Sequence, residues 1–144
     1  MSTAVNETPE YPKYMIPRIT PEAGEFFTGA LRGELRLQRC TACGRHQHYP
    51  RLLCSHCGVE ELEWVTASGR GTVHSYTVIR QNSVPPFDQW LPFVVALVEL
   101  EEDGARMLAT MPDVAPEGVS IGMPVVAAYR PANDRVAFVD FRPA

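Results

Sequence analysis

The sequence predicts a mainly β protein, in which an N-terminal helix and a four-cysteine zinc ribbon precede a five-stranded OB-fold barrel. Two observations lead to this fold class. All four cysteines fall in two C-x-x-C pairs, Cys40 with Cys43 and Cys54 with Cys57, and a glycine follows each pair. Five short segments rich in β-branched and aromatic residues come after the cysteines, which fits a small closed barrel.

The totals are consistent with one sizeable core and a small appendage. The chain has 144 residues, with 13 prolines and 10 glycines, which favours short strands and many turns over a helix bundle. We expect an arm and helix in 1–34, a rubredoxin-like ribbon in 35–67 and the barrel in 68–144. The net charge of −4 counts against a dedicated nucleic-acid-binding protein.

Residues 1–34 begin with a polar, proline-punctuated segment. Its apolar side chains between Tyr11 and Ile16 either lie on a surface, of this chain or of a partner, or belong to a disordered arm. A helix is then predicted, with Thr20 as N-cap, Pro21 in the first turn and Gly33 at the end. Its apolar residues recur at helical spacing and form one packing face: Ala23, Phe26, Phe27, Ala30 and Leu31.

The ribbon is predicted from the two C-x-x-C pairs and the alternating segments 35–39 and 61–65 that flank them. Four thiolates at tetrahedral corners are the donor set of a structural zinc site, and they leave no open position for catalysis. A segment this small cannot bury a core alone, so the metal would supply most of the folding free energy, about 10–16 kcal/mol in zinc-finger peptides.

Other uses of the four cysteines remain open. Iron in a rubredoxin-like site would take the same ligands. Two disulfides would need an oxidising compartment, and no export signal is visible, so we expect a cytoplasmic protein with reduced thiols. A redox site would need only one pair. We expect the nearby His46, His48 and His56 to be exposed loop residues.

The barrel strands are predicted at 72–80, 92–101, 106–111, 124–130 and 136–141. The second and third form a hairpin around the turn signal at 102–104, and residues 112–122 are predicted to be a loop. Gly69-Arg70-Gly71 is predicted to form a turn. The acidic run from Glu99 to Asp103 is predicted to be the solvated end of a hairpin.

The loop 84–93 joins the first two barrel strands and is stiffened by prolines. It contains two aromatic residues, Phe87 and Trp90, that are candidates for binding a protein partner, because stiff loops lose little entropy on docking. The alternative is that Trp90 folds back and plugs one end of the barrel.

No catalytic motif is apparent. The chain has no G-x-S-x-G elbow, phosphate-binding glycine loop or H-E-x-x-H sequence, and a cysteine nucleophile is unavailable if all four bind metal. The longest clean apolar run, residues 93–98, is too short to span a bilayer. Five arginines in the helix and ribbon could face the phosphates of CoA or balance the charge of the metal centre: Arg32, Arg36, Arg39, Arg45 and Arg51.

From about Phe26 to the C-terminus the sequence resembles the acyl-CoA-associated zinc-ribbon/OB-fold family, domain-of-unknown-function family thirty-five. The matching motifs are LQRCTACG (37–44), YPR (49–51), CSHCG (54–58), LEW (62–64), SGRGTV (68–73), SYT (75–77), IGMPV (121–125) and FRP (141–143). Some relatives lack part of the cysteine set, whereas this chain has all four.

The resemblance implies a working context. Family members look like small, non-catalytic subunits of thiolase-superfamily enzymes, either acyl-CoA thiolases or lipid-transfer-protein-like aldolases of sterol side-chain breakdown. They help to shape the acyl-CoA site. No hydratase-like domain is fused to this sequence, so the partner is expected to be a separate chain in a hetero-oligomer, with neither nucleic acid nor membrane as a ligand. The alternatives are a free-standing acyl-CoA carrier and a single-stranded nucleic-acid-binding protein.

Overall fold

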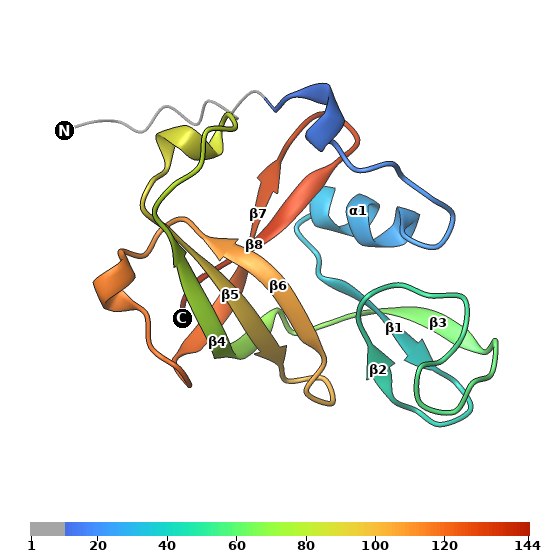
Figure 1. The fold of residues 1–144 in the computed structure, drawn as a ribbon. Helices are drawn as coiled ribbons and strands as arrows, with labels where there is room; N and C mark the ends of the chain where they lie inside the picture. Colours follow the sequence, from blue (N-terminus) through green and yellow to red (C-terminus); the bar gives the residue numbers. More distant parts are fainter. Residues whose placement is uncertain (1–10) are drawn as a thin grey trace.

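The computed structural model describes residues 11–144 and contains one α-helix and two antiparallel sheets (Figure 1). The elements are η1 (Lys13–Met15), α1 (Gly24–Leu31), β1 (Arg36–Cys40), β2 (His46–Gln47), β3 (Leu62–Thr66), β4 (Arg70–Ile79), η2 (Phe87–Gln89), β5 (Phe93–Leu100), β6 (Arg106–Met111), η3 (Pro116–Gly118), β7 (Pro124–Pro131) and β8 (Ala137–Pro143). The predicted fold class, with a helix, a ribbon and an OB-fold, is confirmed.

Helix α1 begins later than the sequence pattern predicts. The N–H of Ala23 donates to the carbonyl of Thr20 at 3.1 Å, so residues 20–23 form a separate turn and Thr20 is not the N-cap. The predicted end is confirmed, because Gly33 takes a φ of +75°, which favours glycine. Phe26 and Ala30 are buried as expected, whereas Leu31 is exposed.

The ribbon sheet has the strand order β2-β1-β3. Strand β1 lies in the middle and pairs with both neighbours, so that Gln38 stands opposite Gln47 on one side and Trp64 on the other. Leu37 and Cys40 of this strand are fully buried. The two knuckles extend from the end of this sheet, at the lower right of Figure 1.

The second sheet has the strand order β6-β5-β4-β7-β8 and matches the five predicted strands. A register irregularity lies between Val73 and Ser75 of β4, where it pairs with β5, and bulges of this kind increase the bend of a strand. The curled sheet brings its two edge strands together, and Thr110 of β6 donates a hydrogen bond to Asp140 of β8 at 2.6 Å. The core inside the curl includes Val73, Val98 and Phe141.

Helix α1 and the N-terminal arm cover the side of the barrel where β6 and β8 meet. Helix α1 contacts β8, β7 and β1, and so lies between the barrel and the ribbon (Figure 1). Tyr11 of the arm is buried and its ring lies 5.2 Å from that of Phe138 on β8. Tyr11 therefore anchors the arm to its own chain, whereas Tyr14 is exposed; the start of the predicted arm, residues 1–10, lies outside the described residues. In residues 11–144, no helix has the length and apolarity that crossing a membrane requires.

The acidic hairpin end between β5 and β6 is not simply solvated, which corrects the prediction. Asp103 accepts two hydrogen bonds from His46, one from its backbone N–H and one involving Nδ1, both at 2.8 Å. Glu101 pairs with Arg70 at 3.1 Å. The hairpin end therefore ties the barrel to the ribbon, and Arg70 begins β4 instead of lying in a turn.

Candidate functional site

The structure brings the four cysteines together at one point. Their sulfur atoms all lie within 4.8 Å of one another, and the closest cross-knuckle pairs are Cys40 with Cys57 at 3.6 Å and Cys43 with Cys54 at 3.7 Å. Sulfurs bound to one tetrahedral zinc at about 2.3 Å would be about 3.8 Å apart. A disulfide would need about 2.0 Å. The donor set and its spacing fit a structural metal centre.

Each knuckle is formed by its own backbone. The N–H of Gly44 donates to the carbonyl of Cys40 at 2.8 Å, and the N–H of Gly58 donates to that of Cys54 at 3.0 Å. Both glycines have a φ near +80°, at 79° and 81°. The backbone N–H groups of Cys57 and His56 also donate to the sulfur of Cys54, and these bonds, together with those from the neighbouring thiols, lower the pKa of that thiol to about 6. Such donors favour the thiolate that a metal needs.

Two buried glutamines hold the second knuckle against the ribbon sheet. Gln38 donates to the carbonyl of Arg51 at 2.8 Å, and Gln47 accepts from the N–H of Ser55 at 2.7 Å. The two side chains also bond to each other at 2.8 Å. The alternation of residues 35–39 places Gln38 on the polar face with Arg36, so its burial is not expected from the sequence. The two glutamines position Cys54 and Cys57, which lie in a segment without strands of its own.

The arginines near the ribbon are mostly paired with carboxylates. Arg36 bonds to Glu25 at 3.0 Å, and Arg39 bonds to Glu63 at the same distance. Arg32 contacts both Glu25 and Glu34 at 3.2 Å. The positive charges of these three arginines are therefore balanced by glutamates.

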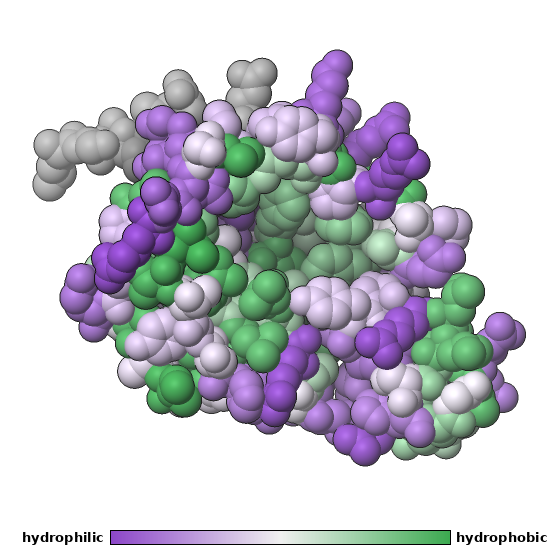
Figure 2. All heavy atoms as spheres, viewed as in Figure 1, coloured by the Kyte–Doolittle hydropathy of each residue, from purple (hydrophilic) through white to green (hydrophobic). Residues whose placement is uncertain are grey.

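An apolar cavity of about 460 Å³ lies between α1, the ribbon loop 48–50, strands β6 and β8, and the N-terminal arm. Figure 2 shows it as a hollow with a hydrophobic lining near the centre of the molecule. No sequence motif indicates it, because its walls come from segments of the arm, α1, the ribbon and the barrel that are far apart along the chain. Its lining includes Phe26, Phe27, Met107, Leu108 and Val139.

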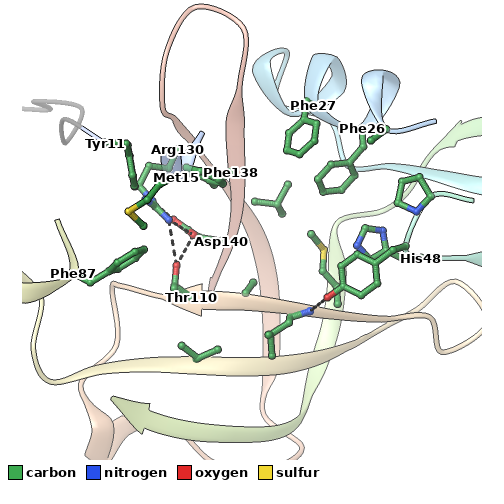
Figure 3. A pocket seen from close by; sticks show the side chains of 18 residues that line it. Tyr11, Met15, Phe26, Phe27, His48, Phe87, Thr110, Arg130, Phe138 and Asp140 are labelled. Carbon is green, nitrogen blue, oxygen red and sulfur yellow. Dashed lines mark hydrogen bonds and ion pairs between the residues drawn. The ribbon is translucent and has the colours of Figure 1, made fainter. Parts of the chain in front are cut away.

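An ion pair lies at one end of the cavity. Arg130 of β7 bonds to Asp140 of β8 through two nitrogens, at 2.7 and 2.8 Å, and Asp140 is almost fully buried (Figure 3). The guanidinium also lies 4.7 Å from the centre of the Trp90 ring and 5.3 Å from that of Phe138. The sequence alone does not pair Arg130 with Asp140, because they belong to different strands.

His48 lies at the other end of the cavity, which corrects the expectation that it is exposed. Its ring contacts those of Phe26 and Tyr49 in tilted arrangements, with centroid distances of 5.1 and 4.1 Å. Burial lowers the pKa of His48 to about 4, so the imidazole is neutral at pH 7. His56 is exposed as expected, and His46 is held by Asp103.

The half-buried His48 imidazole, with its lowered pKa, predicts a loss of stability in mild acid. The unfolded chain protonates His48 below its ordinary pKa of 6.5, whereas the folded chain stays neutral down to about 4. The unfolded state therefore binds more protons, and folding weakens as the pH falls from 6.5 towards 4. We expect His48→Phe to remove on the order of 1 kcal/mol of the difference in unfolding free energy between pH 7 and pH 5. Urea denaturation at both pH values measures it, and His56→Phe should leave the difference unchanged.

Phe87 and Trp90 are half-buried in a cluster of aromatic rings. Their rings contact each other edge to face at 5.3 Å, and Phe93 stacks on Phe87 at 5.7 Å. One part of the Trp90 ring contacts Arg130, and another part of its surface is exposed to solvent. Docking of a partner on these two residues remains a prediction.

Two family models match the chain in sequence. Residues 27–63 match "ChsH2, rubredoxin-like zinc ribbon domain", and residues 64–130 match "ChsH2, C-terminal OB-fold domain". The first covers both knuckles, and the second covers β4 to β7 and most of β3.

Several curated proteins are similar to this chain. A probable enoyl-CoA hydratase alpha subunit of Thermomonospora curvata is 39% identical over 96% of the chain, and the 3-oxo-4,17-pregnadiene-20-carboxyl-CoA hydratase alpha subunit of Mycobacterium tuberculosis is 41% identical over 80%. The chain spans only 43% and 36% of their lengths. A DUF35 domain-containing scaffold protein of Methanothermobacter thermautotrophicus is 36% identical, over 72% of this chain and 77% of that protein.

Solved structures share the fold. A chain of the Ltp2-ChsH2(DUF35) aldolase has a TM-score of 0.79 and 38% identity, and the match covers 89% of this chain and 98% of that one. A protein of unknown function from the DUF35 family of Sulfolobus solfataricus has a TM-score of 0.60 at 22% identity, covering 86% of each chain, which shows the likeness of fold alone. The chain therefore belongs to the ChsH2/DUF35 family of zinc-ribbon and OB-fold proteins.

Proposed function

We propose that this chain is a non-catalytic, metal-binding subunit that associates with a thiolase-superfamily enzyme, a thiolase or an aldolase, and helps to form its acyl-CoA site. The observation that carries the proposal is the likeness to a chain of the Ltp2-ChsH2(DUF35) aldolase, nearly all of which is matched at 38% identity. Three relatives named DUF35 domain-containing scaffold proteins, 36–40% identical to this chain, fit the same kind of role.

The side chains of the proposed metal centre support a structural role. Cys40, Cys43, Cys54 and Cys57 would hold the metal, which we expect to be zinc, and four sulfur donors fill a tetrahedral ion. Such a centre has no open position at which a substrate or a water could be activated. Its contribution would be to hold the knuckles, and with them the ribbon surface, in place for a partner.

The purified chain should therefore show no thiolase, aldolase or hydratase turnover by itself. The chain tagged in its source organism and isolated under native conditions should retain a thiolase-superfamily protein, identified by mass spectrometry. Turnover of acyl-CoA substrates should appear in the retained complex and disappear when the chain is removed. Robust turnover by the isolated chain would contradict the proposal, as would native isolation that retains no enzyme of this superfamily.

The loop 84–93 is our candidate for the partner surface. If Trp90 docks on the enzyme, Trp90→Ala should leave the isolated chain folded and weaken the complex by about 2 kcal/mol, as expected for an interface tryptophan. The partly exposed ring and its rigid neighbours Phe87 and Phe93 support this choice. Affinity is measured by calorimetry with the isolated partner.

The same variant also tests the alternative that Trp90 is a plug. Its contact with Arg130 at 4.7 Å means that truncation could instead weaken the fold, which would lower the melting temperature of the isolated chain. Tyr14→Ala is the matched control, because Tyr14 is a 78% exposed aromatic residue in the arm. Unchanged partner affinity with a lower melting temperature would rule out docking through Trp90.

A further inference from the structure

The apolar cavity collects polar atoms that have no hydrogen-bond partner. Among residues 11–144, five buried side-chain nitrogen or oxygen atoms lack one, and three of these belong to cavity-lining residues: Tyr11 Oη, His48 Nε2 and Arg130 Nη1. A buried polar atom without a partner costs about 1–3 kcal/mol. Their gathering around one cavity makes it a candidate site for a ligand that supplies the missing partners.

The polar atoms lie at two places in the cavity. In Figure 3, Tyr11 and Arg130 stand together at one end, and His48 stands at the other, with Phe26 and Phe27 on the wall beside it. Most of the remaining lining is apolar and includes side chains such as Met107 and Val139. The volume of about 460 Å³ falls in the range of about 300–1,000 Å³ that small-molecule sites occupy. A fitting ligand has an apolar body with a polar atom at one end or at both.

The charges of Arg130 and Asp140 determine which ligand group can bind at this end of the cavity. Two nitrogens of this guanidinium already bond to the carboxylate of Asp140, so the pair is close to neutral overall. The remaining Nη1 is a donor, and the hydroxyl of Tyr11 can donate as well. A second carboxylate here would lie beside the buried Asp140, and like charges in an apolar site repel strongly. An uncharged carbonyl oxygen can accept from either donor without that cost.

We propose that the cavity binds an uncharged apolar molecule that carries a carbonyl group, such as an ester, thioester or ketone, with its oxygen facing Arg130 and Tyr11. His48 lies at the opposite end, where its neutral ring can bond to a second polar atom of the ligand. The ion pair and the apolar lining are formed by residues of this chain, so binding can be tested without the proposed enzyme partner and without CoA.

The proposal is tested on the isolated, metal-loaded full chain by calorimetric titration with a matched pair of probes. Methyl decanoate and decanoate have the same acyl chain but differ in charge. We expect saturable binding of the ester, at least about tenfold tighter than that of the acid, because an uncompensated carboxylate is costly to bury. Fluorenone, a rigid ring ketone, is a third probe. If fluorenone competes with the ester, the site accepts fused rings as well as flexible chains. If the ester binds tightly and fluorenone does not bind, the proposal is restricted to flexible chains.

Variants locate the binding. Tyr11→Phe removes only the hydroxyl, and we expect it to weaken ester binding by about three- to tenfold. Tyr14→Phe, in the same arm but 78% exposed and outside the cavity, should leave the affinity unchanged. Ala109→Leu fills the cavity from β6 and should abolish binding, with far-UV circular dichroism confirming that the variant is folded.

Three results would overturn the proposal. The first is no saturable binding of the ester or of fluorenone, and the second is an acid that binds as well as its ester. The third is equal affinities for Tyr11→Phe, Tyr14→Phe and the unmodified chain. None of these results bears on the enzyme partner, because all measurements use the chain by itself. Failure to retain a thiolase-superfamily protein would likewise leave the cavity proposal untouched.

Discussion

Cys→Ser at any one of Cys40, Cys43, Cys54 and Cys57 is expected to release one zinc per chain and to unfold residues 35–67 while the barrel keeps its strands. The four sulfurs lie within 4.8 Å of one another, so losing one leaves an incomplete donor set. The ribbon has a small three-stranded sheet and two knuckles, and metal binding contributes about 10–16 kcal/mol in comparable zinc peptides.

Elemental analysis with thiol counting measures the metal, and amide hydrogen exchange shows where structure is lost. Ser55→Ala is the control, because Ser55 lies inside the second knuckle but is not a ligand candidate; only its backbone N–H bonds to Gln47. Native protein that carries no metal and two disulfides would contradict the zinc-ribbon assignment. Iron in place of zinc would leave the fold argument intact and change only the identity of the ion.

Asp140→Ala should lower the free energy of unfolding by about 3–5 kcal/mol, because it leaves the guanidinium of Arg130 buried without its carboxylate. Asp140 is only 4% exposed, and it accepts bonds from Arg130 and from Thr110. The bonds join β7 to β8 and β8 to β6, so their loss should loosen the place where the barrel closes. Urea denaturation of the metal-loaded chain measures the effect.

Two further variants test whether the loss of stability comes from the unpaired charge or from substitution in general. Asp113→Ala removes an exposed carboxylate and should change the free energy of unfolding by less than about 0.5 kcal/mol. The double change Arg130→Met with Asp140→Leu replaces both charges by apolar groups and should recover much of the loss. A single Asp140→Ala variant as stable as the Asp113→Ala control would show that the ion pair does not stabilise the barrel.

Features that depend on a few neighbouring residues could be predicted from the sequence. The knuckles follow from the C-x-x-C-G spacing, because two sulfurs and a glycine with positive φ define one tight turn. The five barrel strands follow from β-branched and alternating residues, and strand β6 lies at the predicted 106–111. The predicted start of α1 was wrong, because residues 20–23, which carry the capping signals, form a separate turn before the helix.

Contacts between distant segments were decided only by the tertiary structure. Gln38 and Gln47 are polar residues inside the ribbon, and only the pairing of β1 with β2 shows that they satisfy each other. Arg130 and Asp140 meet across two strands, and His48 becomes half-buried because α1 packs over the ribbon loop. Short-range spacing encodes turns and strands, whereas the cavity exists only after the arm, helix, ribbon and barrel have packed around it.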